Sequence, residues 1–287
     1  MHRLRYDGND RIRCATPEGE VLFEYRLARV ERVETRAHRG LSLHVLAFSD
    51  WRVQEIEDLL TYVASGPRPD VILYAGDDVE RFRPDGRNYF EELARLSVYG
   101  LCAVAGNDEN PDSRGLIAGK RVHPVHSCPL IIGPFAVVGL EGAPLFRDGR
   151  LNMGPLLYPL AFRWSLMQRW ARRFSRKKLI IVAHAPPHGV LDFAVRHARD
   201  HIGCRALREF LETSTGSVLC VCGHVHRCGG QLERIGGTVV VNVASHDRKG
   251  DAGKVAKISI KKGRIGDIQW CEIGGTQGRL FSGVSLE

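Results

Sequence analysis

The chain has 287 residues, of which 44% are hydrophobic and 26% are charged, and it carries a net charge of +8. This composition is typical of a folded protein and excludes collagen, coiled-coil and wholly disordered chains. No uninterrupted apolar stretch approaches the ~20 residues of a membrane-spanning helix, and the charged N-terminus lacks the apolar segment of a signal peptide. We therefore expect a cytoplasmic protein that does not bind a membrane.

The excess of positive charge comes from arginines concentrated in residues 3–39 and 163–178. A basic surface suits an anionic partner, such as a nucleotide, a nucleic acid or another phosphorylated compound. It is equally typical of an ordinary solvated surface, so charge alone does not select a function. The sequence indicates no oligomeric state.

Eight cysteines are scattered along the chain, and Cys220, Cys222 and Cys228 bracket a pair of histidines. This spacing invites comparison with a zinc site. However, Cys220 and Cys222 alternate inside one apolar run, where both side chains would point to the same face of a strand. Because free cysteine behaves mostly as a small buried hydrophobic residue, we favour core packing over zinc binding.

The chain divides into three parts by its pattern. Residues 1–40 have short alternating apolar positions around a Pro-Glu-Gly turn, which predicts a basic N-terminal β-hairpin extension. Residues 41–272 alternate β-rich runs with helical patterns and are expected to form one domain, and residues 273–287 form a C-terminal tail. Alternation of strand and helix, followed by antiparallel hairpins, predicts an α/β fold whose sheets are covered by helices.

The expected elements of the domain follow one another in a regular order. Apolar runs predict strands within 41–50, 71–77, 101–107, 179–184, 218–224 and 238–245. Apolar positions at helical spacing predict helices near 56–63, 90–96, 159–176 and 204–212. Hairpins are expected in 130–142, turning at Gly133-Pro134, and in 254–273, turning at Lys262-Gly263. We expect the aromatic residues of the basic helix at 159–176 to face the core rather than to stack on bases.

Polar residues that can bind metals follow almost every strong strand. They are Asp50, Asp77, Asn107, His184, His224 and His226. In an open α/β sheet the ligand site lies beyond the carboxyl ends of the strands, so these side chains are expected to converge. Carboxylate, amide and imidazole ligands together suit Mn, Fe or Zn better than Ca or Mg. The sequence therefore predicts a two-metal centre, with Asp77 as the natural bridge.

The same residues carry a resemblance to a known superfamily. In chain order, the motifs are Asp50-Trp51-Arg52, Gly76-Asp77-Asp78, Gly106-Asn107-Asp108-Glu109, His184 and Gly223-His224-Val225-His226. They resemble the D-x-H, G-D, G-N-H-D/E, H and G-H-x-H blocks of the calcineurin-like metallophosphoesterases. The stretch 184–192 is also similar to an H-x-P-P-x-G-x-x-D block of a bacterial and archaeal branch.

The resemblance implies a four-layer sandwich of two mixed β-sheets flanked by helices, with the site at one end. It also implies one or two divalent metal ions, manganese first, with iron, zinc or nickel as alternatives. A first metal would be held by Asp50, Asp77 and His226, and a second metal by Asp77, Asn107, His184 and His224. The implied reaction is hydrolysis of a phosphomonoester or phosphodiester by a metal-bound hydroxide.

Two residues depart from the family pattern. Arg52 stands where the family has a histidine ligand of the first metal, and a guanidinium has no lone pair to offer a metal. Asp108 stands where the family has a histidine that steadies the phosphate and helps to protonate the leaving group. General acid–base assistance of that kind is commonly worth ~10²–10⁴-fold in rate. We expect Arg52, Asn107 and Asp108 to act on the substrate, with His188 as a further substrate-binding candidate.

Three interpretations of these departures remain open. The chain is an active enzyme with a weaker first metal, or Arg52 replaces that metal and binds the phosphate through its fork of N–H donors. In the third interpretation catalysis is lost and the fold serves as a binding or scaffold protein. A nuclease-like enzyme that acts on nucleic acid is a further alternative, and it predicts salt-sensitive binding.

Overall fold

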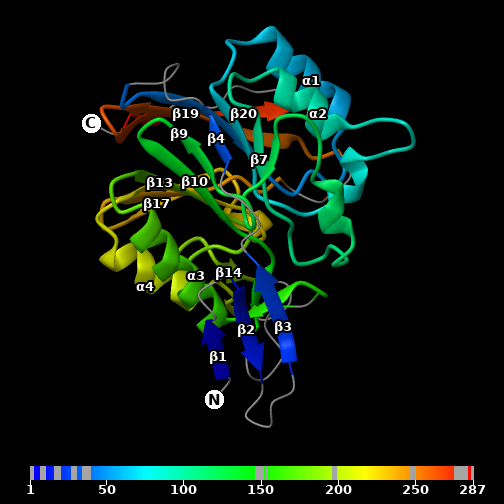
Figure 1. The fold of residues 1–287 in the computed structure, drawn as a ribbon. Coiled ribbons are helices and arrows are strands. Elements are labelled where there is room, and N and C mark those ends of the chain that lie inside the picture. The colour runs from blue at the N-terminus through cyan, green and yellow to red at the C-terminus, as the bar shows by residue number, and fades with distance from the viewer. Residues whose placement is uncertain are drawn as a thin grey trace.

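The computed structural model describes residues 3–6, 11–15, 21–26, 31–33, 40–145, 152, 154–195, 199–245, 248, 250–274 and 284–285. Within these residues, two seven-stranded mixed sheets pack face to face. Helices cover the outer face of each sheet, so that the molecule has four layers (Figure 1). The predicted fold class is confirmed.

The first sheet is built around parallel strands. Its strands in spatial order are β21 (Val284–Ser285), β20 (Arg264–Ile273), β19 (Gly253–Lys261), β5 (Leu43–Phe48), β6 (Val71–Tyr74), β7 (Leu101–Ala103) and β8 (Val122–Pro124). Helices α1 (Ile56–Ser65) and α2 (Tyr89–Arg95) cover its outer face. In α1, the buried residues Ile56, Leu59 and Val63 recur at helical spacing, and this apolar stripe attaches the helix to the sheet.

The second sheet also has parallel strands at its centre. Its strands in spatial order are β17 (Gln231–Ile235), β18 (Thr238–Asn242), β16 (Ser217–Cys222), β13 (Lys178–Ala183), β10 (Phe135–Leu140), β9 (Leu130–Ile132) and β4 (Glu31–Val33). Helices α3 (Leu160–Arg173) and α4 (Arg205–Thr213) pack together on its outer face. Phe162 and Trp170 of α3 are buried, as expected for aromatic residues that face the core, whereas Trp164 is half-buried.

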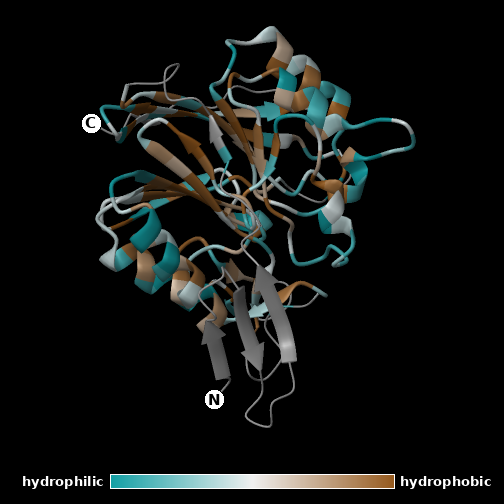
Figure 2. Cartoon of the chain, in the orientation of Figure 1, coloured by the Kyte–Doolittle hydropathy of each residue, from teal (hydrophilic) through white to brown (hydrophobic). Residues whose placement is uncertain are grey.

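The strands of both sheets are buried on their two faces. In β5, Leu43 and Val45 face the core between the sheets, whereas Leu46 and Phe48 pack toward the helices. This double burial explains why the strands are almost continuous apolar runs in the sequence. Figure 2 shows the hydrophobic colouring concentrated in the sheets, with hydrophilic residues on the outward faces of the helices.

Two hairpins and the cysteine-containing strand agree with the sequence-based expectations. Strands β9 and β10 pair antiparallel across the Gly133-Pro134 turn, and β19 and β20 pair antiparallel across Lys262-Gly263. Cys220 and Cys222 lie in β16 with fully buried side chains. Both side chains belong to a hydrophobic core, as expected.

The N-terminal segment forms a small antiparallel sheet of its own. It contains β1 (Arg3–Tyr6), β2 (Arg11–Ala15) and β3 (Val21–Arg26). The expected hairpin corresponds to β2 and β3, and β1 adds a third strand. Strand β4, which also precedes residue 41, pairs with β9 in the second large sheet. Strand β21 lies in the expected C-terminal tail and pairs with β20, and the proposed division into three parts stays a prediction.

The remaining short elements lie near the carboxyl ends of the parallel strands. They are the strand pairs β11 (Ala143–Leu145) with β12 (Leu157–Pro159) and β14 (Phe193–Ala194) with β15 (Asp200–His201), and the 3₁₀ turns η1 (Val79–Phe82), η2 (Ser113–Leu116) and η3 (His226–Cys228). Among the helices of the described residues, none has the length and apolarity needed to cross a membrane.

Candidate metal centre

The two large sheets meet at the carboxyl ends of their parallel strands. A bridge between Ser49 and Ala244 joins the end of β5 to the segment that follows β18. In addition, the backbone N–H of Asp50 donates to the carbonyl of Gly76 at 3.0 Å. The loops after β5, β6, β13 and β16 therefore lie together, as expected for strands that run in parallel.

The backbone at this end turns sharply where the polar residues occur. Asp50, Asp77, Asp78 and His224 all have positive φ angles, of 53°, 68°, 62° and 66°. Residues with side chains seldom adopt this left-handed conformation, and such strain is concentrated at functional sites. The turns direct the side chains of successive strand ends into one space between the sheets.

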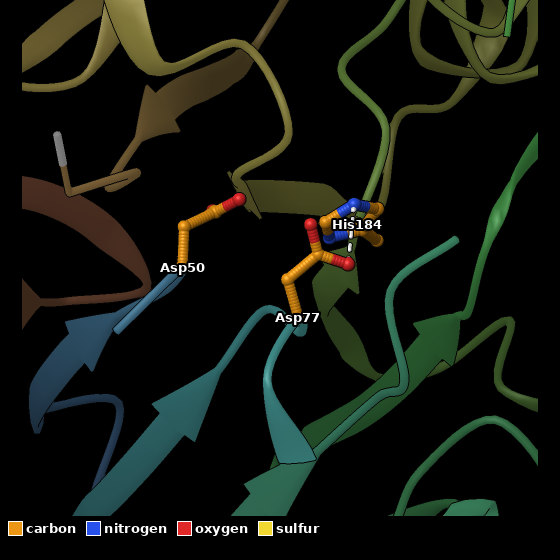
Figure 3. Close-up of side chains that lie close together, drawn as sticks. All are labelled: Asp50, Asp77 and His184. Atoms are coloured by element: carbon orange, nitrogen blue, oxygen red, sulfur yellow. Dashed lines mark ion pairs between the residues drawn. The ribbon is translucent and has the colours of Figure 1, made fainter. Parts of the chain in front are cut away.

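Asp50, Asp77 and His184 form a buried cluster of metal-capable side chains (Figure 3). One ligand atom from each residue lies within 4.8 Å of the others, and all three side chains are buried. In the part of the chain that the structure describes, this is the one such group of histidine, cysteine, aspartate or glutamate side chains. Three residues that are far apart in sequence, and come from both sheets, are therefore brought together.

His184 is held so that one ring nitrogen faces oxygen atoms. Its Nδ1 lies 2.8 Å from the carbonyl oxygen of Ala75, which can only accept, so Nδ1 carries the proton. Its Nε2 lies 2.9 Å from Oδ1 of Asn107 and 3.4 Å from Oδ1 of Asp77. With the proton on Nδ1, an unprotonated Nε2 would face two acceptor oxygens, those of Asn107 and Asp77. Such a grouping is stabilised by a cation.

The amide of Asn107 is oriented by Asp108. Nδ2 of Asn107 donates to Oδ1 of Asp108 at 2.6 Å, which turns Oδ1 of Asn107 toward His184. The other carboxylate oxygen of Asp108 lies 2.6 Å from Nη2 of Arg52. Asp108 therefore links the amide of Asn107 to the guanidinium of Arg52.

His224 and His226 approach the cluster from the loop after β16. Nε2 of His226 lies 3.0 Å from Oδ1 of Asp50, and the backbone N–H of His224 donates to Oδ2 of Asp50 at 3.2 Å. The rings of His184 and His224 meet edge to face with their centroids 4.9 Å apart. Burial opposes ionisation of Asp50, but His226, together with His184 and Ser49, outweighs it and holds the pKa of this carboxyl well below its usual range.

Burial shifts two other site groups in the opposite sense. It raises the pKa of Asp77, with Asp50 and Asp108 adding to the rise, while His184 and Arg52 oppose it. Burial also lowers the pKa of His224 well below its usual value, and the neighbouring His184 adds to this shift. In the metal-free protein the neutral forms of Asp77 and His224 are therefore favoured. A bound cation would stabilise the ionised Asp77 carboxylate.

Arg52 lies among the acidic residues of the centre. Its Nη2 is 2.6 Å from Oδ2 of Asp77 and 2.6 Å from Oδ2 of Asp108, and its Nε is 3.0 Å from Oδ2 of Asp78. Burial lowers the pKa of Arg52, but the charge of Asp77 and the other carboxylates raises it by more. Burial raises the pKa of Asp78 to about 6, although Arg52 opposes this shift. The guanidinium thus neutralises part of a crowded acidic site.

Residues 43–228 match the family model described as calcineurin-like phosphoesterase, which is more than half of the chain. The chain belongs to the calcineurin-like phosphoesterase family. A curated relative from Arcobacter nitrofigilis, described as a probable glycerophosphodiester phosphodiesterase, is 23% identical over 168 residues. That match covers 56% of this chain and spans 58% of the relative's length.

Two solved structures have a fold similar to that of this chain. The protein TT1561 of Thermus thermophilus has a TM-score of 0.56 and 17% identity, and the match covers 82% of this chain and 99% of that one. A dimetal phosphatase from Danio rerio has a TM-score of 0.53 and 13% identity, with coverage of 85% and 99%. At these identities the likeness establishes the fold alone.

The donor set of this centre is chemically suited to a divalent metal. Carboxylate, amide oxygen and imidazole nitrogen are the ligands preferred by manganese, iron and zinc. The acceptor atoms of Asp77, Asn107 and His184 face one another within a buried space. The residues therefore fit the metal that the family uses, while the identity of the metal stays a prediction.

His188 lies apart from these donors. Its Nδ1 is 3.6 Å from Oδ2 of the buried Asp192, and its ring contacts that of His201. Asp192 in turn accepts hydrogen bonds from the backbone N–H groups of Gly189 and Gly203 at 2.9 and 3.0 Å, so this carboxylate organises the loop. Among the described contacts of His188, none joins it to the donor cluster, and its role in substrate binding stays a prediction.

Sequence reasoning missed two residues that support the centre. Arg81 donates to the carbonyls of Trp51 and Gln54 at 2.8 and 3.0 Å and so holds the loop that carries Arg52. Asn152 accepts a hydrogen bond from His224 across the site. Neither residue belongs to a recognisable motif, because each acts through contacts with partners distant in the sequence.

Gly106 is expected to be essential for the packing of the centre. A Cβ atom added there would overlap Oδ1 of Asp77 and press on the backbone N of Asp77. Gly106→Ala should therefore destabilise the protein by about 1–3 kcal/mol and weaken Mn²⁺ binding. Urea unfolding and Mn²⁺ titration would measure both effects. Gly115→Ala is the matched control, since nothing lies within 4 Å of its added Cβ; equal behaviour of the two variants would contradict the prediction.

Proposed function

We propose that this chain is a metal-dependent phosphodiesterase with one firmly held divalent ion beside the guanidinium of Arg52. The ion would be held by Asp77, Asn107, His184 and His224. When bound, it supplies Lewis acidity toward a phosphoryl oxygen and lowers the pKa of water. The remaining chemistry falls to the side chains of the chain itself.

The position of Arg52 is the observation that carries this proposal. The two carboxylate oxygens of Asp77 face different partners. Oδ1 lies 3.4 Å from Nε2 of His184, whereas Oδ2 lies 2.6 Å from Nη2 of Arg52. A bridging carboxylate needs the second oxygen for the first metal, and here the guanidinium has taken that place. Arg52 thus provides the second positive charge of the centre, with a fork of N–H donors that matches two phosphate oxygens.

Asp50 and His226 then serve as a support rather than as a strong metal site. Nε2 of His226 lies 3.0 Å from Oδ1 of Asp50, and Oδ2 of Asp50 accepts a hydrogen bond from the backbone N–H of His224. The pair therefore fixes the loop that presents His224. This assignment differs from the first-metal role that the family resemblance implies, and it depends on the same observation at Arg52.

Charge balance favours a phosphodiester over a phosphomonoester. A diester carries one negative charge, whereas a monoester carries close to two above its second pKa of ≈ 6. The centre would offer a substrate limited positive charge, because it has one divalent ion and one guanidinium that is already paired with carboxylates. The printed description of the Arcobacter nitrofigilis relative, a probable glycerophosphodiester phosphodiesterase, supports the same substrate class.

We assign Asp108 an orienting role. It holds the amide of Asn107 and a guanidinium nitrogen of Arg52, each at 2.6 Å. Both groups would contact the phosphate, so Asp108 positions the substrate-binding atoms. With both oxygens accepting hydrogen bonds, Asp108 is poorly placed to donate a proton, and water would protonate the leaving group. Substrates with good leaving groups, such as aryl esters, should then react fastest.

Metal content measured together with hydrolysis tests the proposal. We expect close to one metal ion per chain and Mn²⁺-stimulated hydrolysis of a bis-aryl phosphodiester, faster than of an aryl phosphomonoester. Two ions per chain with turnover would contradict the role of Arg52. Absence of both metal and turnover would overturn the enzyme assignment in favour of a binding protein. Faster cleavage of single-stranded nucleic acid than of small diesters would instead support the nuclease-like alternative.

A further inference from the structure

Asn152 lies buried beside the metal centre, although no motif marks it. Only 4% of its surface is exposed, and its side chain makes three hydrogen bonds. Nδ2 donates to the carbonyl oxygens of Pro144 and Ile202 at 3.0 and 3.1 Å, and Oδ1 lies 2.9 Å from Nε2 of His224. The residue therefore joins β11, the segment after β15 and the loop after β16.

These partners determine which way round the amide lies. Two carbonyl oxygens can only accept hydrogen bonds, so the atom that faces them must be the nitrogen with its two hydrogens. The amide oxygen consequently faces His224. Because an amide oxygen also can only accept, Nε2 of His224 must be the ring nitrogen that carries the proton.

We propose that Asn152 is a positioning residue that fixes His224 in the Nε2–H tautomer and leaves Nδ1 as the nitrogen available to a metal. A metal-binding histidine usually donates its other ring N–H to a polar partner, and that contact sets both the tautomer and the orientation of the ring. Here the partner is a neutral amide. Its two further hydrogen bonds prevent it from turning over.

A hydrogen bond also fixes the tautomer of His184, but there the proton lies on the other ring nitrogen. Its Nδ1 donates to the carbonyl of Ala75 at 2.8 Å, which leaves Nε2 as the acceptor atom. The two imidazoles of the centre therefore present different nitrogens, Nε2 from His184 and Nδ1 from His224. This inference rests on the part of the proposed function that concerns metal binding, and it does not depend on hydrolysis.

The tautomer is tested directly by ¹⁵N NMR of the histidine rings, in the metal-free protein and in the protein loaded with diamagnetic Zn²⁺. We expect His224 to show a protonated Nε2 and an unprotonated Nδ1 in both samples. An Nδ1–H tautomer in the wild-type protein would overturn the proposal. This measurement needs no variant, so it stands even where a substitution impairs folding.

Two substitutions distinguish the contribution of the amide oxygen of Asn152 from that of its two N–H donors. Asn152→Leu removes all three hydrogen bonds, and we expect a mixture of tautomers and Mn²⁺ affinity reduced about 10–100-fold. Asn152→Asp keeps an acceptor for His224 but loses the donors to Pro144 and Ile202. It should be less stable in urea than the wild type, yet keep the Nε2–H tautomer.

Mn²⁺ affinity is read from the electron paramagnetic resonance signal of free Mn²⁺, without any substrate. Asn110→Leu, which changes an exposed asparagine, is the control and should leave the affinity unchanged. An Asn152→Leu protein with the wild-type tautomer and wild-type affinity would refute the role of Asn152. Normal metal binding without hydrolysis in the wild type would instead count against the proposed function and leave this inference intact.

Discussion

Asp77→Asn is expected to lower the kcat/KM for a bis-aryl phosphodiester by about 10³-fold and to abolish tight binding of Mn²⁺. Asp77 is the carboxylate that faces both His184 and Arg52, at 3.4 and 2.6 Å. Its replacement by a neutral amide removes the charge that attracts the cation. Asparagine is a better choice than alanine, because Asp77 has a φ of 68° and asparagine tolerates the left-handed region.

The stability of this variant distinguishes loss of function from loss of fold. Burial raises the pKa of Asp77, so its charge is costly in the metal-free protein. The asparagine variant should therefore unfold at a urea concentration close to that of the metal-free wild type. Asp112→Asn, an exposed position, is the control for activity. Metal-dependent turnover near the wild-type rate in Asp77→Asn would show that the metal does not need the Asp77 carboxylate, and would contradict its role as a ligand.

Arg52→His should lower the kcat/KM for the diester by about 10²–10³-fold, the usual effect of removing one donor that stabilises a developing negative charge. A histidine at this position lacks the guanidinium fork and leaves Asp77, Asp78 and Asp108 without their shared cation. Metal content should stay close to one ion per chain, measured by elemental analysis beside steady-state kinetics.

The opposite result at position 52 would identify a dormant two-metal site. If Arg52→His raised the metal content to two ions per chain and increased turnover, a histidine ligand would have restored the first metal. The doubly substituted protein, with Asp108→His added, would then be more active still. Arg95→His is the control, because Arg95 forms a surface pair with Glu91 whose contribution to stability is small.

Much of the fold was predictable because the local pattern of apolar residues indicates which positions are buried. The apolar stripe of Ile56, Leu59 and Val63 identified α1, and the continuous apolar runs identified strands buried on both faces. The third strand of the N-terminal sheet and the place of β4 beside β9 were not predicted. Short strands with mixed composition have weak periodicity, and their partners are chosen by the rest of the sheet.

The candidate site was likewise predictable only in part. Asp50, Asp77, Asn107 and His184 were recognisable because each follows a strand, and parallel strands end at one edge. The sequence could not show that one oxygen of Asp77 faces His184 while the other faces Arg52. It depends on side-chain directions at two positive-φ turns and on a loop held by Arg81.

The sequence by itself determined the class of fold, the succession of the main strands and helices along the chain, and the residue types gathered at the strand ends, because periodicity and strand termination are local properties. Only the tertiary structure decided which atoms face one another. Asn152 and His224 are 72 positions apart, and Asp50 and His226 are 176 positions apart. Contacts over such separations are set by the packing of the two sheets, so the tautomer of His224 and the carboxylate partners of Arg52 are properties of the assembled molecule.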